Sequence, residues 1–140
     1  MRFFTPALVL AALAALVATA VALGSGAGAA HGKSIPVKLK EMSVLPTPKS
    51  AKTGSVTFVV TNVGEVEHEF VVLRHDAAGR LPVKKFKAVE DHAAVVDEIE
   101  DIKPKTTRRF TVQLEQGKYY LFCNVPGHYQ LGMSVTFRVT

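Results

Sequence analysis

The chain has a single cysteine, Cys123, among its 140 residues, so no disulfide can form within it. Residues 30–140 contain no internal repeat and no long low-complexity stretch, and their number suits one domain with one modest core. The 17 basic side chains outnumber the 12 acidic ones, but they are scattered in pairs without an aromatic stacking motif. This pattern is not that of a nucleic-acid-binding protein.

The first 29 residues have the pattern of an export signal. Arg2 supplies the positive charge, an apolar run extends from Pro6 to Leu23, and residues 27–29 match the A-x-A cleavage pattern. We therefore predict a signal peptide over 1–29 and a mature domain over 30–140 that is periplasmic, displayed on the cell surface or secreted. Because the apolar run is about as long as a short membrane-spanning helix, a retained N-terminal anchor is the alternative.

Short strand-like runs dominate the predicted mature domain. Apolar and polar residues alternate over 35–39 and over 56–60, which indicates strands with one buried face. The continuous apolar run Phe70–Leu73 is typical of a strand that is covered on both faces. Further strands are expected over 109–114, 118–123 and 134–139. Closely spaced turn signals separate these runs, so we predict an all-β antiparallel sandwich.

One segment departs from this strand pattern. Its apolar residues recur at helical spacing, and they are Phe86, Val89, Ala93, Val96 and Ile99. The spacing predicts a short amphipathic helix or a flap over residues 86–100, lying on the sandwich. The β-branched pair Val95-Val96 favours a strand as the alternative.

Three residues of metal-ligating type stand close together in YLFCNVPGHYQLGMS, and a fourth stands upstream in EVEHEF. They are Cys123, His128 and Met133, with His68 before them. One thiolate, two imidazoles and one thioether form the ligand set of a blue-copper site. Pro126-Gly127 supplies the reversal that folds His128 back toward Cys123. Taken singly, each residue would be ordinary core or solvated surface, but together they predict one type 1 copper per chain.

A mixed set of soft and nitrogen ligands binds both Cu(I) and Cu(II), which suits single-electron transfer. Copper oxidases and nitrite reductases need a second copper centre between domains, and this chain offers one site, so we predict no enzyme. A dinuclear centre would need a second cysteine in the loop, and a Cys-His hydrolase would need a third group that orients His128. Storage, delivery or resistance to copper is the alternative function. Exchangeable delivery sites favour Met-rich sequences, and this chain has only three methionines.

The segments GKYYLFCNVPGHYQLGMSVTFRV and TNVGEVEHEF resemble the cupredoxins, and among them the sulfocyanin, auracyanin and rusticyanin type. The resemblance covers about 35–140. It implies a Greek-key sandwich of seven or eight strands, a type 1 copper and electron transfer outside the cytoplasm. By motif, His68, Cys123 and His128 would be equatorial ligands and Met133 the axial one. The chain departs from many relatives in having Glu69, where they have Asn, and in lacking the disulfide of azurin-like members.

The ring edge of His128 is the expected electron port. A small docking patch is expected around it, made of Pro126, Tyr129, Leu131 and Gly132. The net charge of +5 favours a redox partner with an acidic face, or association with an anionic membrane surface. We expect a monomer. His31 would be the second residue of the mature chain, where its imidazole and the terminal amine predict an accessory Cu(II) site.

Overall fold

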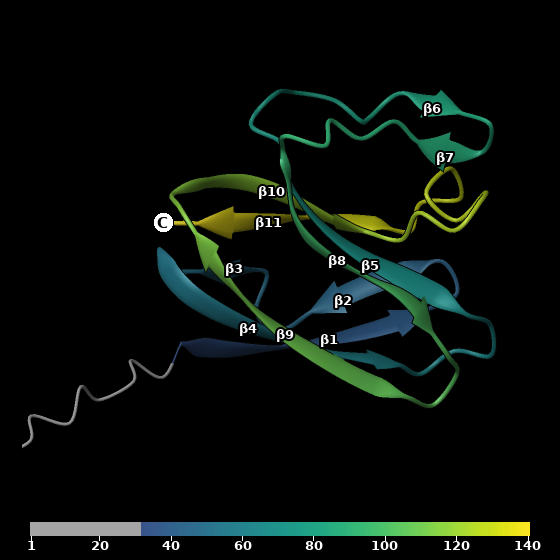
Figure 1. Ribbon diagram of the computed structural model, residues 1–140, viewed down its shortest axis with the longest axis horizontal. Coiled ribbons are helices and arrows are strands. Elements are labelled where there is room, and N and C mark those ends of the chain that lie inside the picture. The colour runs from purple at the N-terminus through teal and green to yellow at the C-terminus, as the bar shows by residue number, and fades with distance from the viewer. Residues whose placement is uncertain (1–31) are drawn as a thin grey trace, which may run out of the picture.

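The computed structural model describes residues 32–140, which form two β-sheets packed face to face (Figure 1). The predicted signal peptide, its cleavage site and His31 lie outside the described residues. Within the described part of the chain, no helix is long and apolar enough to cross a membrane.

Nine strands make up the two sheets. The first sheet has the order β2 (Ser43–Pro46), β1 (Lys33–Lys40), β4 (Gly54–Asn62) and β9 (Thr107–Leu114). The second has the order β3 (Ser50–Ala51), β11 (Ser134–Val139), β10 (Gly117–Phe122), β5 (His68–Arg74) and β8 (Val95–Ile102). The predicted all-β sandwich is confirmed, and the two-residue β3 accounts for the strand beyond the expected seven or eight. Two pairings, β1 with β4 and β3 with β11, are parallel.

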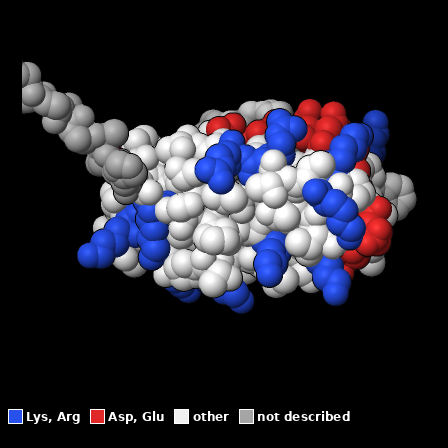
Figure 2. Space-filling model, turned by 90° about the horizontal axis from the view of Figure 1, so that it is seen from below, with Lys and Arg blue, Asp and Glu red and all other residues white. Residues whose placement is uncertain are grey.

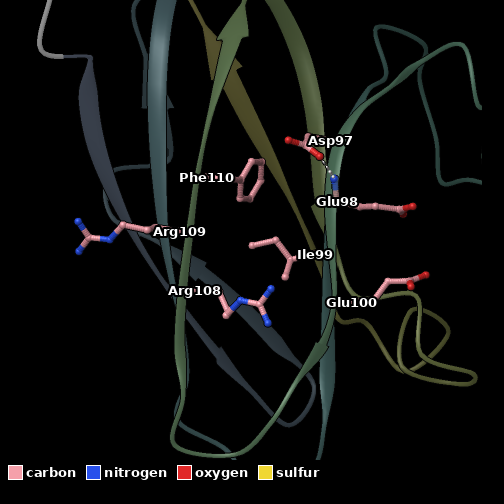
Figure 3. Close-up of a pocket in the computed structure, with 7 residues that line it drawn as sticks. All are labelled: Asp97, Glu98, Ile99, Glu100, Arg108, Arg109 and Phe110. Atoms are coloured by element: carbon pink, nitrogen blue, oxygen red, sulfur yellow. Dashed lines mark hydrogen bonds between the residues drawn. The ribbon is translucent and has the colours of Figure 1, made fainter.

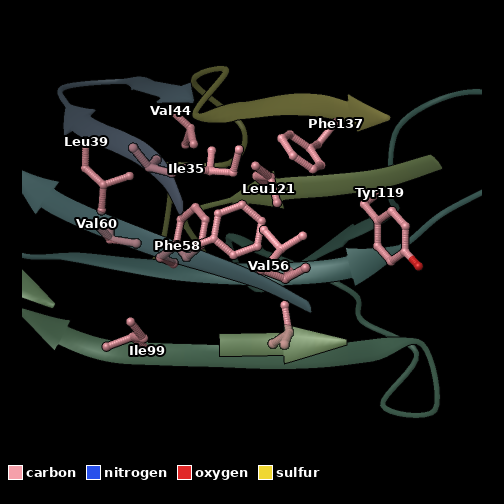
Figure 4. Close-up of a cluster of buried hydrophobic side chains, with 14 of the residues drawn as sticks. Ile35, Leu39, Val44, Val56, Phe58, Val60, Ile99, Tyr119, Leu121 and Phe137 are labelled. Carbon is pink, nitrogen blue, oxygen red and sulfur yellow. The ribbon is translucent and has the colours of Figure 1, made fainter. Parts of the chain in front are cut away.

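The core between the sheets follows from the alternation in β1 and β4. Alternate residues of both strands are buried and the residues between them are more exposed, and the buried apolar ones are Ile35, Val37, Leu39, Val56, Phe58 and Val60. In the parallel register Ile35 lies beside Phe58, so the buried faces of the two strands are continuous. The Phe58 ring contacts Phe70 and Phe137 edge-on, with centroids 5.5 and 5.6 Å apart. Figure 4 shows Phe58 and Phe137 among the buried side chains of this core. Each such buried side chain contributes about 1.5–3 kcal/mol to folding.

The strand β5 is buried on both faces, as the run Phe70–Leu73 predicted. Phe70 and Val72 belong to the core between the sheets, while Val71 and Leu73 point to the other side. There they join a second cluster, whose remaining buried members are Leu81, Ala88, Phe122 and Tyr129. The segment between β5 and β8 therefore covers the outer face of the second sheet and contributes a small core of its own.

The short helix expected over 86–100 is wrong. The first part of the segment lies on the second sheet as the expected flap, and the strand alternative is confirmed for Val95-Val96. The segment begins in the turn of a small hairpin, made of β6 (Val83–Lys84) and β7 (Lys87–Ala88), and continues into β8, which pairs antiparallel with β5. A helix would need one buried stripe, but Phe86 and Val89 are exposed, with 68% and 46% of their surface accessible. Ile99 is buried because it lies opposite Phe70 in the β5–β8 ladder. The residues at helical spacing belong to the hairpin, the connection after it and a strand, so their spacing arose by chance.

Candidate metal centre

The four predicted ligands lie at one end of the second sheet. His68 is the first residue of β5, and Cys123 directly follows the last residue of β10. His128 and Met133 lie in the connection from β10 to β11. Because β5 and β10 are antiparallel neighbours, the start of one lies beside the end of the other. Topology therefore brings His68 to the ligand loop from 55 residues away in sequence.

Three donor atoms converge at this end. Nδ1 of His68 lies 3.2 Å from Nδ1 of His128, and Sγ of Cys123 lies 3.8 and 3.4 Å from these two nitrogens. Thiolate and imidazole bonds of about 2.3 and 2.1 Å in a trigonal plane leave donor atoms about 3.6–3.8 Å apart. The observed triangle is close to that size, so the donor set fits a metal ion at its centre.

Backbone hydrogen bonds within the ligand loop hold its shape. The Cys123 N–H donates to the Met133 carbonyl (3.1 Å), and the Met133 N–H donates to the His128 carbonyl (3.0 Å). The expected reversal is present at Pro126-Gly127, where Gly127 adopts φ 89°. The Met133 side chain is fully buried in the same core as Cys123. The loop is thus closed on itself from its first residue to its last.

Burial sets the protonation of the candidate ligands. It raises the pKa of the Cys123 thiol to about 11, even though the Glu69 N–H donates to Sγ at 3.3 Å. Burial also lowers the pKa of His68 and of His128. The imidazoles are therefore neutral and able to donate a lone pair, while the thiol keeps its proton until a metal displaces it.

Asn124 connects the ligand loop to the β6–β7 hairpin. Its side chain accepts from the Ala88 N–H (2.7 Å) and donates to the Ala88 carbonyl (3.2 Å) and to Glu90. A second link joins the Gly127 N–H to the Phe86 carbonyl at 2.7 Å. Asn124 is not among the predicted ligands, and no role was predicted for it from the sequence. An asparagine beside a predicted ligand was the available signal for a bracing role.

A second support organises the loop before His68. Asn62 is fully buried, donates to the carbonyls of Val66 and Ile102 and accepts from the Gly64 N–H. The carboxylate of Glu41 accepts from the N–H groups of the same loop. The pKa of Glu41 is lowered to about 2 by its own backbone N–H and then by those of the loop. Neither residue stood out in the sequence, because both lie outside the ligand motifs.

The prediction that Tyr129 belongs to the docking patch is wrong, because Tyr129 is fully buried. Its hydroxyl accepts from the Leu81 N–H at 2.8 Å, and its ring contacts Phe122 edge-on. The guanidinium of Arg80 lies 4.6 Å from the centre of the ring. The patch was assigned by closeness to His128 in sequence, but the turn directs Tyr129 away from the surface and into the second core.

A Cys-His hydrolase is disfavoured by the same contacts. Asn124 is committed to Ala88 and Glu90 and gives His128 no hydrogen bond. The high pKa of Cys123 is also the reverse of what a nucleophilic thiolate requires.

A pocket between the edge strands β8 and β9 contains none of the predicted ligands. Acidic side chains come from β8 and basic ones from β9 (Figure 3). Its lining residues are Asp97, Glu98, Ile99, Glu100, Arg108, Arg109 and Phe110.

Comparison with known proteins places this fold. The chain belongs to the family described as the cupredoxin-like domain, whose model matches residues 8–135. The structure is similar to dithionite-reduced auracyanin from Roseiflexus castenholzii, with 18% identity, a TM-score of 0.57 and coverage of 78% of this chain and 98% of that one. It is also similar to rusticyanin from Thiobacillus ferrooxidans, with 22% identity, a TM-score of 0.56 and coverage of 78% of this chain and 79% of that one. A third similar structure is auracyanin A from Chloroflexus aurantiacus, described as a "blue" copper protein. Its identity is 22% and its TM-score 0.51, with coverage of 75% of this chain and 99% of that one.

The TM-scores show a shared fold, and at these identities the structural similarity shows the fold alone. No curated protein matches the chain. Membership of the cupredoxin-like family, together with the arrangement of His68, Cys123, His128 and Met133, supports one type 1 copper per chain.

Proposed function

We propose that this chain is an electron carrier in which Nδ1 of His68, Sγ of Cys123 and Nδ1 of His128 would hold the copper, with Met133 as the fourth ligand. When bound, the copper supplies one-electron chemistry between Cu(II) and Cu(I). The observation that carries the proposal is the convergence of the three donor atoms, all within 4.8 Å of one another, from separate points of the chain.

The surroundings of the ligands favour electron transfer over copper handling. Cys123, His68 and Met133 are fully buried, and the loop that carries two of them is tied at both ends. Such a site resists rearrangement between oxidation states, and it hinders the ligand exchange that storage and delivery require. The backbone N–H of Glu69 supports Sγ directly, so this bond does not depend on the side chain that replaces the Asn of many relatives.

The surface around His128 suits a brief encounter with a redox partner. His128 is half-buried, while Pro126, Leu131 and Gly132 around it are exposed. Phe86 at the tip of the hairpin is also exposed, and its carbonyl is bonded to the ligand loop. These residues form a small patch with apolar character, the size class of transient redox interfaces. Leu131, with 67% of its surface accessible, is its most prominent aliphatic member.

Leu131→Lys is the test of this patch. We expect slower electron transfer to the physiological partner with an unchanged copper spectrum. Val96→Lys is the matched control, since it adds the same charge to an exposed apolar position near the opposite end of β5. Equal rates in the two variants would remove the patch from the proposal.

The partner we propose is a protein with an acidic face, outside the cytoplasm. Figure 2 shows Lys and Arg side chains spread over one face of the molecule, with Asp and Glu gathered toward part of its margin. With a net charge of +5, association with an acidic partner should slow as salt is added. Rates that do not change with ionic strength would argue against this electrostatic attraction.

The visible absorption spectrum after addition of one equivalent of Cu(II) tests the function itself. We expect an intense thiolate-to-copper band that a mild reductant bleaches and that Cys123→Ser lacks. A spectrum without this band, with copper bound equally well by Cys123→Ser, would contradict the type 1 assignment and make copper handling the leading hypothesis.

A further inference from the structure

One ring nitrogen of His68 faces away from the other candidate ligands. Nδ1 faces the donor atoms of Cys123 and His128, whereas Nε2 is fully buried and has no hydrogen-bond partner. A buried imidazole nitrogen without a partner is costly and calls for an explanation. The charged group near it is the Glu41 carboxylate, with Oε1 3.6 Å from Nε2.

The Glu41 carboxylate is held in place by backbone. Oε1 accepts from the N–H of Glu65 at 2.7 Å and from the N–H of Val66 at 3.1 Å. Gly64 leaves the room for it, because a Cβ at that position would lie 2.2 Å from Oε1. Glu41 itself lies in the connection between β1 and β2. The first sheet thus carries a fixed negative charge to the loop that precedes the first candidate ligand.

A carboxylate accepts hydrogen bonds and donates none when ionised. The nitrogen that faces it must therefore carry the proton, and the other nitrogen of the ring must carry the lone pair. Partners of this kind fix the tautomer and orientation of metal-binding histidines and raise their basicity. A fixed negative charge near a metal also favours its higher oxidation state.

We propose that Glu41 is a positioning residue for the metal centre, which keeps the proton of His68 on Nε2, presents Nδ1 to the metal and favours Cu(II) over Cu(I). The metal part of this inference rests on the proposed function. The tautomer part stands on the contacts of Glu41 alone and can be tested without metal.

The substitution that tests it is Glu41→Gln. The amide oxygen can still accept from the loop N–H groups, so the loop keeps its anchor while the charge is lost. The matched control is Glu67→Gln, which removes the same charge from the residue beside His68, where the carboxylate pairs with Lys103 instead. Glu41→Asp retains the charge on a shorter arm and serves as the second variant should the amide disturb folding.

Two readouts are measured. The first is the tautomer of His68 in the metal-free protein, from the ¹⁵N chemical shifts of its ring. We expect the Nε2–H form in the wild type and in Glu67→Gln, and a mixture in Glu41→Gln. The second is the reduction potential with copper bound. A change of one charge at this range alters the ratio of Cu(II) to Cu(I) affinity by about tenfold, which equals about 59 mV for one electron.

We expect the potential to rise in Glu41→Gln, to move much less in Glu67→Gln and to move less than half as far in Glu41→Asp. Equal shifts in Glu41→Gln and Glu67→Gln would overturn the proposal, since the effect would then be that of net charge. A tautomer unchanged by Glu41→Gln would overturn it as well. If the wild type shows no thiolate-to-copper band, the proposed function fails, and the tautomer still decides the role of Glu41.

Discussion

The link between Asn124 and the β6–β7 hairpin yields a prediction for Asn124→Ala. This substitution removes both partners of the Ala88 backbone, the acceptor of its N–H and the donor to its carbonyl. Ala88 is buried, with 5% of its surface accessible, so water does not readily replace them. Each buried polar group left without a partner costs about 1–3 kcal/mol. We expect Asn124→Ala to lower the free energy of unfolding by about 3 kcal/mol.

The measurement is urea unfolding of the metal-free protein, because bound metal would add its own stabilisation. The chain has no tryptophan and three tyrosines, so circular dichroism and tyrosine fluorescence report the transition. In thermal unfolding the same loss corresponds to about 12 °C for a domain of this size. Limited proteolysis should also become faster within the hairpin.

Thr111→Val is the matched control, because it deletes a hydroxyl hydrogen bond to Thr57 (2.7 Å) that is exposed on the first sheet. It should change the free energy of unfolding by no more than about 0.5 kcal/mol. A loss below about 1 kcal/mol in Asn124→Ala would refute the reasoning, since the Asn124 bonds would then stabilise no more than exposed ones.

Three further predictions follow from burial. Because burial lowers the pKa of His68 below its ordinary 6.5, the unfolded chain binds this proton more tightly. The metal-free protein should keep this contribution above pH 6.5 and lose it as the pH falls through the folded pKa, by up to about 1.4 kcal/mol per pH unit from His68 alone in urea titrations. His128, whose pKa burial also lowers, adds to the loss, and a flat profile would contradict this prediction. Because burial raises the pKa of Cys123 to about 11, copper uptake should release its proton, and affinity in chelator competition should rise about tenfold per pH unit between about pH 7 and 9. An affinity independent of pH would mean that the thiolate is already present. Tyr129→Phe leaves the Leu81 N–H without its acceptor and should cost about 1–3 kcal/mol, whereas Tyr120→Phe, whose hydroxyl bonds to an exposed carbonyl, should cost less.

Strands could be predicted from the sequence wherever the pattern of apolar residues showed which side chains are buried. The alternation in β1 and β4 and the apolar run in β5 report burial directly, and all three lie where the pattern placed them. The hairpin β6–β7 gave no such signal. Its two-residue turn is Lys85-Phe86, with φ of 49° and 65°, where glycine or asparagine is usual. Without those residues, the helical spacing nearby suggested the wrong structure.

The donor residues of the site could be predicted from the sequence, but the residues that hold the donors in place could not. Cys123, His128 and Met133 share one short segment, so their chemistry could be considered together. Glu41 and Asn124 act through contacts that only the fold creates, with His68 and with Ala88. Ligand type is a property of the side chain, but a supporting contact is a property of a pair, and one member of each pair lies far away in sequence.

The bonds between the ligand loop and the hairpin also define what could be transplanted. Exchange of ligand loops between related scaffolds treats the segment from Cys123 to Met133 as a module. In this chain such an exchange would leave the Ala88 backbone and the Phe86 carbonyl without Asn124 and Gly127. The module that can be moved intact therefore consists of two pieces of chain, the loop and the hairpin that caps it, and a graft of either piece alone would be incomplete.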